Sequence, residues 1–342
     1  MSRTASLAAV NAKVGKLNSK LLKDNDYIEL SHLKSVKEII GYLQNNSEIG
    51  SQLNLYDRTY EVQYKMRQYR KRQLEKVSHY FSGDYRKFSE ALMSEFEIVD
   101  IKRILRALKQ KELSDFDLKK LQVEESFKLT EDSTLHSFIN SLKHSRYYKV
   151  LHAYENESDD VILFYMEMNL DKLYYNSLVE SSKTLPKKDY GSVLKLVGSK
   201  IDLLNINWIY RGLKHYNLLP EELINFCILG GNKLKYEDLK KLCYVENVDG
   251  LVEQVLNSEY KFLFDSENTD IYMDRRLRRY LYYLAKRESK KGNLTIGKYL
   301  AYTFLLDFEV KDISSIMETT RFDISFEEKL KFLARSYKGS EV

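Results

Sequence analysis

A chain of 342 residues with 43% hydrophobic and 13% aromatic residues carries enough apolar surface for a core, which excludes a globally disordered protein. Its length favours two or three sub-domains over one compact core. The 55 basic and 50 acidic residues leave a formal net charge of only +5, so the charge permits nucleic-acid binding without demanding it.

The composition favours long, uninterrupted helices that do not cross a membrane. The chain has only 2 prolines and 13 glycines, the two residue types that interrupt helices and strands. The longest apolar run, near Tyr299–Leu306, is far shorter than the roughly 20 residues of a membrane-spanning helix. Residues 1–10 are too weakly apolar for a signal peptide. The two cysteines, Cys227 and Cys243, cannot form a disulfide framework, so we expect small buried residues in a reducing compartment.

Apolar residues recur at helical spacing along most of the chain. Long amphipathic runs cover residues 56–72, 92–108 and 299–316, whereas strand-like alternation is rare and short. Shorter amphipathic segments precede the long runs and end at Leu43, Leu142 and Leu256. We therefore predict an all-α fold.

One sequence pattern occurs three times without gaps. It reads acid, aliphatic, any residue, Asp or Asn, Ile, two residues of any type, Ile and a large apolar residue. The copies start at Glu97, Asp202 and Glu309, and their Asp/Asn positions (Asp100, Asn205 and Asp312) are 105 and 107 residues apart. Upstream, Tyr165-Met166-Glu167 and Tyr272-Met273-Asp274 are also 107 apart, and Tyr60 precedes Tyr165 by 105. This recurrence predicts one helical unit present three times.

Two polar breaks separate the units. They fall at residues 114–133 and 229–232, and the second contains the turn signal Gly230-Gly231-Asn232. We place the boundaries in these breaks, which gives helical repeats at residues 1–125, 126–230 and 231–342.

The repeated polar positions have a structural and a functional interpretation. Glu97, Asp202 and Glu309 could bind a ligand in threefold fashion. The structural interpretation is preferred, because short polar side chains such as Asn205 can hydrogen-bond nearby backbone and cap or bend a helix.

Searches for catalytic and cofactor motifs find none. The patterns GxxxxGK[ST], HExxH, CxxC and GxSxG are absent, and Gly230-Gly231-Asn232-Lys233 lacks the spacing of a phosphate-binding loop. Basic clusters at residues 70–72, 275–279 and 286–291 alternate with tyrosines, as in some nucleic-acid surfaces. Each also carries acids nearby, so we interpret them as solvated helix faces. We expect no cofactor, no metal, no small-molecule substrate and no nucleic acid.

The three motif copies, together with Leu218-Leu-Pro220-Glu221-Glu222-Leu223 and the opening segment from Asn11 to Val36, resemble the C subunit of prokaryotic V/A-type rotary ATPases, the counterpart of the d subunit of the eukaryotic vacuolar pump. The resemblance spans nearly the whole chain. The sequence departs from the family pattern at Asp100 and Asp312, where Asn is usual, and at Glu318, where the other copies have Arg106 and Arg211.

The resemblance implies a mechanical role. Family members are funnels of three similar helical domains around a pseudo-threefold axis. They sit on the cytoplasmic face of the membrane, as peripheral proteins on the rotor ring, and receive the D and F subunits of the central stalk. The resemblance thus implies a non-catalytic socket in a proton- or sodium-translocating ATPase or synthase, with Arg106 and Arg211 as candidate stalk-binding residues. The alternatives are a helical-repeat scaffold with another partner and a nucleic-acid-binding helical protein.

Overall fold

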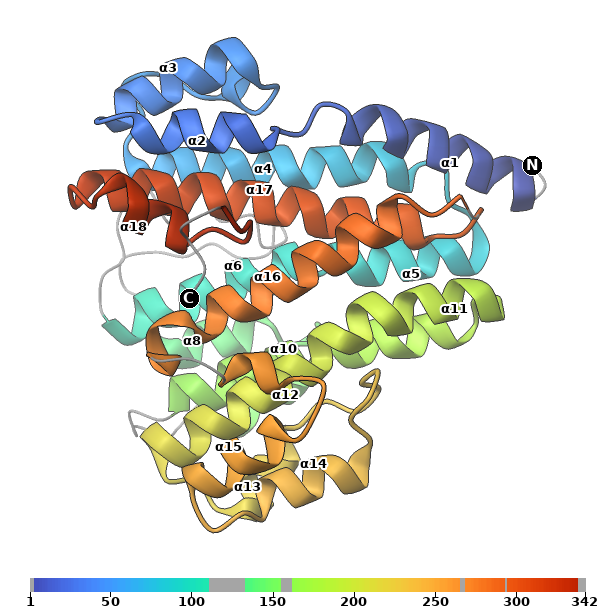
Figure 1. Ribbon diagram of the computed structural model, residues 1–342. Helices are drawn as coiled ribbons and strands as arrows, with labels where there is room; N and C mark the ends of the chain where they lie inside the picture. The colour runs from blue at the N-terminus through green and yellow to red at the C-terminus, as the bar shows by residue number, and fades with distance from the viewer. Residues whose placement is uncertain (1–2, 111–132, 155–161, 265–267, 293, 338–342) are drawn as a thin grey trace.

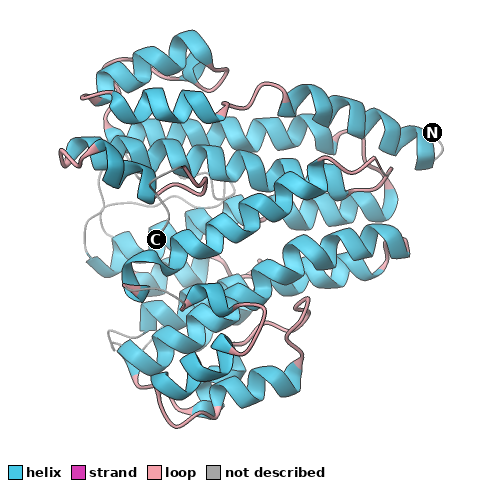
Figure 2. Ribbon diagram, in the orientation of Figure 1, coloured by secondary structure: helices cyan, strands magenta, loops and turns pink. Residues whose placement is uncertain are grey.

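Every regular element in the described part of the chain is a helix. The computed structural model describes residues 3–110, 133–154, 162–264, 268–292 and 294–337, and it contains no strand in these ranges (Figure 1, Figure 2). The predicted all-α class is confirmed. None of the helices in these ranges is long and apolar enough to cross a membrane.

Six α-helices and a short 3-10 helix at Gly50–Gln52 lie within the described residues 3–110. The α-helices are α1 (Arg3–Asn18), α2 (Asp24–His32), α3 (Val36–Asn46), α4 (Thr59–Ser78), α5 (Gly83–Met93) and α6 (Glu95–Gln110). Helix α3 starts where Ser35 accepts a hydrogen bond from the backbone N–H of Glu38, which satisfies one of the free donors of the first turn. Helix α4 buries Val62, Met66 and Tyr69 on one face, the spacing that makes a helix amphipathic.

In the middle third, short helices again precede one long helix. This third contains α8 (Leu135–Ser141), α9 (Tyr148–Leu151), α10 (Ile162–Lys183), α11 (Lys187–Val193), α12 (Ser199–Arg211) and α13 (Pro220–Phe226). Two π-helical turns, Leu194–Gly198 and Gly212–Tyr216, flank α12. Helix α13 starts with Pro220 at its first position, and the Glu222 carboxylate accepts from the N–H of Leu219.

The last third contains α14 (Tyr236–Cys243), α15 (Val248–Leu256), α16 (Thr269–Ser289), α17 (Gly297–Arg321) and α18 (Phe326–Lys331). Cys227 and Cys243 are buried, as predicted from the sequence, and remain free thiols with their sulfur atoms 3.8 Å apart. Residues 227–235 form a loop without helix, so the turn predicted at Gly230-Gly231-Asn232 is confirmed.

The motif helices pack against the long helices in a cyclic order. Helix α6 packs on α10, α12 packs on α16, and α17 packs on α4. The N-terminal helices α1 and α2 also lie against α17, so the first and last parts of the chain are neighbours (Figure 1). The buried apolar residues form one continuous core. The three domain boundaries, the funnel and its threefold axis stay predictions, and the boundary at residue 125 lies outside the described residues.

The run predicted over residues 92–108 is not one helix. A turn at Ser94 separates α5 from α6, whereas the third copy runs unbroken through α17. In the second copy, the π-helical turn at residues 194–198 stands in this place. The apolar spacing continues across Ser94, so periodicity alone could not locate the break.

The basic clusters do not all lie on solvated faces, and that prediction was wrong for three residues. Arg70, Arg275 and Arg276 are 8%, 1% and 6% exposed. Arg275 donates to the carbonyl of Lys331, and Arg276 donates to the carbonyl of Leu263. Buried guanidinium groups bound to carbonyls hold helices together and cannot form an open phosphate-binding surface.

Candidate functional site

The candidate arginines both join a motif helix to the long helix that follows it. Arg106 in α6 binds Glu167 in α10 in a bidentate pair, with Nε–Oε1 and Nη2–Oε2 distances of 2.5 and 2.6 Å. Arg211 at the end of α12 lies 3.5 Å from the Asp274 carboxylate in α16. The arginine side chains are 54% and 47% exposed, so each remains accessible from solvent. The hydrogen bonds that Arg106 donates to Glu167 raise the pKa of Arg106.

The third copy lacks an equivalent ion pair. Glu318 occupies the position of the two arginines in α17 and is exposed. The structure shows no ion pair of Glu318 with any described residue. The three interfaces therefore differ in charge at this position, as the sequence indicates.

In the first two copies, the first acid of the motif binds a later part of the chain. Glu97 accepts a hydrogen bond from the Tyr147 hydroxyl. Asp202 is wholly buried and accepts from the backbone N–H groups of Lys233 and Leu234, at 2.7 and 3.2 Å, and from a tyrosine hydroxyl. Each carboxylate thus fastens its helix to a segment that follows it.

In the third copy, the first acid of the motif, Glu309, binds a residue near the start of the chain. Its carboxylate accepts a 2.6 Å hydrogen bond from the backbone N–H of Leu22, which lies in the linker between α1 and α2. Glu309 is 3% exposed. Burial raises its pKa to about 7, although the Leu22 N–H and the Arg335 charge act in the opposite direction.

In the second and third copies, the Asp/Asn position of the motif holds the backbone of a distant segment, not the local backbone. The Asn205 amide donates to the Ile228 carbonyl and accepts from the Ile228 N–H, at 2.8 and 2.9 Å. Asp312 accepts from the Ala334 N–H at 3.0 Å and pairs with Arg335 at 2.5 Å. The expected local capping or bending was therefore wrong, because the partners lie about 22 residues further along the chain.

The chemistry of these side chains explains why the two aspartates come with arginines. An amide such as Asn205 both donates and accepts, but a carboxylate only accepts and carries a charge. Asp312 is paired with the buried Arg335, and Asp100 lies 2.7 Å from Arg67. Each aspartate at an Asn position thus has a cation that balances its buried charge.

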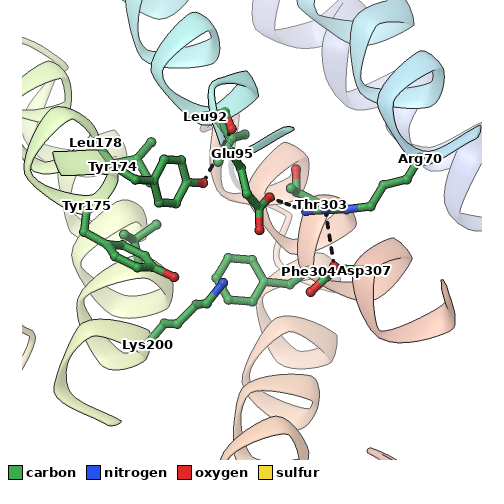
Figure 3. Close-up of a pocket in the computed structure, with 11 residues that line it drawn as sticks. Arg70, Leu92, Glu95, Tyr174, Tyr175, Leu178, Lys200, Thr303, Phe304 and Asp307 are labelled. Carbon is green, nitrogen blue, oxygen red and sulfur yellow. Dashed lines mark hydrogen bonds and ion pairs between the residues drawn. The ribbon is translucent and has the colours of Figure 1, made fainter. Parts of the chain in front are cut away.

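A charged cluster lies where α4, α6, α10, α12 and α17 meet (Figure 3). Glu95, Lys200 and Asp307 are separated by the motif displacements of 105 and 107, so they are equivalent positions of the three copies. The Arg70 guanidinium bridges the two carboxylates, at 2.5 Å from Glu95 and 3.4 Å from Asp307. We name Arg70, Glu95, Lys200 and Asp307 the central cluster.

The central cluster is electrostatically satisfied. Burial opposes the charge of Arg70, but Asp307 and Glu95 outweigh burial and raise the pKa of the guanidinium. Burial likewise opposes the charge of Asp307, but Arg70 and Lys311 hold the pKa of this carboxyl well below its usual value. The Lys200 ammonium lies over two rings, 5.6 Å from the centre of Tyr175 and 5.5 Å from that of Phe304.

The space beside the central cluster is too small for a substrate. Its volume is about 20 Å³, about that of one water-sized probe. Within the described ranges, no three His, Cys, Asp or Glu side chains gather into a possible metal site. The cluster therefore acts as a fastening between helices of all three copies.

Comparison with known proteins identifies the family of this chain. The sequence model of the family described as "ATP synthase (C/AC39) subunit" matches residues 10–329. This chain belongs to that family. The C/AC39 assignment covers all three motif copies, so the contacts described above are features of a C/AC39 protein.

Two curated relatives of this C/AC39 chain are similar over nearly its whole length. The C subunit of the A-type ATP synthase of Methanosphaera stadtmanae is 22% identical over 98% of this chain and 84% of its own length. The C subunit of the A-type ATP synthase of Methanocaldococcus jannaschii is 24% identical over 92% of this chain and 82% of its own length.

The sequence alone identified only part of the C/AC39 contact network. It singled out both arginines and all three motif acids, but it missed their partners and the central cluster. Arg70, Glu95 and Asp307 differ in residue type from their equivalents in the other copies, so a search for repeated letters overlooks them. The displacements of 105 and 107, applied to every charged residue near the motif, would have shown that Glu95, Lys200 and Asp307 are equivalent.

Proposed function

We propose that this chain is the non-catalytic central-stalk component of a V/A-type proton- or sodium-translocating ATPase or synthase. It acts as a socket on the cytoplasmic face of the membrane, where it connects the D and F subunits of the stalk to the rotor ring. Torque passes through the chain, and no covalent bond is made or broken in it.

One observation supports this proposal most strongly. The contacts between motif helices and long helices run along the chain and return from its last part to its first. Helix α17 packs on α4, and Glu309 binds Leu22, so the last helices are tied to the first. A closed body resists twisting better than an open row of units, because no end is free to unwind. Close packing and buried ion pairs such as Arg70–Glu95 add stiffness.

A pull-down with the stalk proteins tests the role of the two arginines. If Arg106 and Arg211 contact the stalk, then Arg106→Glu with Arg211→Glu weakens binding of a purified D–F complex by at least about tenfold, a loss of roughly 1.4 kcal/mol. The same substitutions also break the ion pairs with Glu167 and Asp274, so they need a matched control.

Exchanging the two partners supplies this control. The swap Arg106→Glu with Glu167→Arg keeps an ion pair between α6 and α10 but moves the positive charge to the other helix. A swapped chain that folds normally and still fails to bind D–F supports a stalk contact. Full binding by the swapped chain removes Arg106 from the stalk-binding residues and leaves it a purely internal role.

Purification from detergent-solubilised membranes tests the assembly itself. The proposal expects this chain in a large complex that hydrolyses ATP. Its recovery with another soluble partner, and never with the ATPase, supports the scaffold alternative. A gel shift whose affinity falls steeply with salt supports the nucleic-acid alternative.

A further inference from the structure

A basic cleft is lined by residues of α11, the end of α16 and the start of α17, and it shares no residue with the central cluster. Its volume is about 260 Å³. Four of its lining residues are lysines: Lys188, Lys195, Lys291 and Lys298. We name this site the lysine cleft.

One buried carboxylate organises two of these lysines. The Glu288 side chain is 1% exposed, and its Oε1 atom lies 2.7 Å from both Lys195 and Lys291. Burial opposes the charge of Glu288, but the two ammonium groups beside it outweigh burial and lower its pKa. Glu288 therefore stays ionised, holds two ammonium groups at the cleft and neutralises only one of them.

The other two lysines carry unbalanced charge. Neither Lys188 nor Lys298 has a carboxylate within 4.0 Å in the described part of the chain. The nearby Asp189 does not supply one, because its buried carboxylate accepts from the Ile296 N–H at 2.7 Å and the Tyr85 hydroxyl at 2.6 Å. Four cations and one carboxylate leave an excess of three positive charges around the cleft.

The lining of the cleft suits an oxyanion that accepts several hydrogen bonds at once. The lysines belong to different elements, since Lys188 lies in α11, Lys291 follows α16 and Lys298 lies in α17, and Ser192 and Thr295 add hydroxyl groups. Lysine binds phosphate as a point charge, and several phosphate oxygens can accept from donors on different sides at once. A concave site also concentrates the field of its charges.

We propose that the lysine cleft binds a phosphate group. The group belongs either to the headgroup of an anionic lipid or to a free phosphate, since both present the same oxygens. This inference is independent of the coupling role proposed above, because it rests only on the residues of the cleft.

Binding measurements on the purified full-length chain test the lysine cleft. Calorimetric titration with inorganic phosphate at low ionic strength measures the free anion. Flotation with vesicles of phosphatidylcholine, with and without phosphatidylglycerol, measures the lipid headgroup. The variant Lys188→Gln with Lys298→Gln removes the two unbalanced charges and leaves Glu288 with both of its partners. We expect this variant to lose at least about tenfold in affinity for whichever probe binds.

A matched variant controls for net charge. Lys143→Gln with Lys149→Gln removes the same number of charges from two exposed lysines that lie outside the cleft. Circular dichroism checks that both variants keep their helices. Binding that survives in the control and disappears in the cleft variant supports the proposal. The probe that binds then identifies the source of the phosphate.

Two results would overturn the proposal. In the first, the wild-type chain binds neither inorganic phosphate nor phosphatidylglycerol vesicles beyond the phosphatidylcholine background. In the second, the cleft and control variants lose affinity equally, which would show that net charge, and not the cleft, is responsible.

Discussion

At the scale of single residues, several buried charged side chains each lie beside an oppositely charged side chain. Asp312 and Arg335 are the clearest pair, because their side chains are 0% and 6% exposed and their atoms approach to 2.5 Å. Removing one member of such a pair leaves an uncompensated charge in a medium that solvates it poorly.

The substitution Asp312→Asn tests this balance. It restores the amide found at Asn205 but leaves Arg335 without its closest carboxylate. We expect a loss of about 3 kcal/mol in the free energy of unfolding, measured by urea denaturation. A second substitution, Arg335→Met, should recover much of this loss. The exposed pair Glu180 and Lys183 serves as a control, and Glu180→Gln should leave stability unchanged. If Asp312→Asn and wild type have the same free energy of unfolding, then Asp312 does not compensate the buried charge of Arg335.

Glu309 makes stability depend on pH. Its pKa is raised from 4.5 to about 7 in the folded chain, so the folded state holds a proton that the unfolded state releases. Its contribution is therefore fully present below about pH 4.5 and falls as pH rises towards 7.

Comparison with Glu309→Gln isolates this effect. The stability difference between wild type and variant should shift against the wild type by about 3 kcal/mol between pH 4.5 and 7, at about 1.36 kcal/mol per pKa unit. Urea unfolding at a series of pH values measures this difference. A difference that stays constant over this range would show that folding does not raise the pKa of Glu309.

At this scale the sequence identified the side chains but not their partners. Glu97, Asp202 and Glu309 stand out because they recur. The partner of Glu309, however, is a backbone N–H at Leu22, and any residue other than proline supplies such a group. No sequence signal marks a partner of that kind.

At the scale of elements, glycine permits the loop before α14 to approach α12. A Cβ atom on Gly231 would lie 1.9 Å from the Asp202 carboxylate, which binds this loop. A Cβ atom on Gly198 would lie 2.9 Å from the backbone nitrogen of Asn232. The segment Gly230-Gly231-Asn232, which the sequence predicts to be a turn, therefore also packs closely against Asp202 and Gly198.

Gly231→Ala should force this loop away from Asp202. We expect destabilisation of about 2 kcal/mol, in the range for lost buried hydrogen bonds, measured as a lower thermal unfolding midpoint. Gly191→Ala is the matched control, because a Cβ atom there meets nothing within 4 Å and alanine is the better helix former. Equal thermal unfolding midpoints of the two variants would show that the loop can move away from Asp202 without loss of stability.

The sequence predicted the helices better than the junctions between them. Periodicity located the long runs because one face of each must be apolar. It could not locate the turn at Ser94 or the π-helical turn at residues 194–198, since a break of one or two residues leaves the apolar spacing intact. The third copy keeps one continuous helix there. The backbone conformation at this point therefore differs in each of the three copies.

At the scale of the whole molecule, the three motif helices each pack on a long helix, and the last of them packs on α4 near the start of the chain. The motif displacements of 105 and 107 predicted the recurrence, and the contacts of α6, α12 and α17 follow it. The cyclic order of these contacts could not be deduced from the sequence, because repeated units also form open solenoids. The closure through α17 and α4 becomes visible only in the structure.

The function proposed above is to couple the rotating stalk to the membrane ring. The most direct test compares ATP hydrolysis with ATP-driven ion transport in vesicles that contain the complete complex or a complex lacking this chain. We predict that hydrolysis continues without the chain while transport stops, and that adding the purified chain back restores transport. The same number of ions transported per ATP hydrolysed in both preparations would contradict the claim.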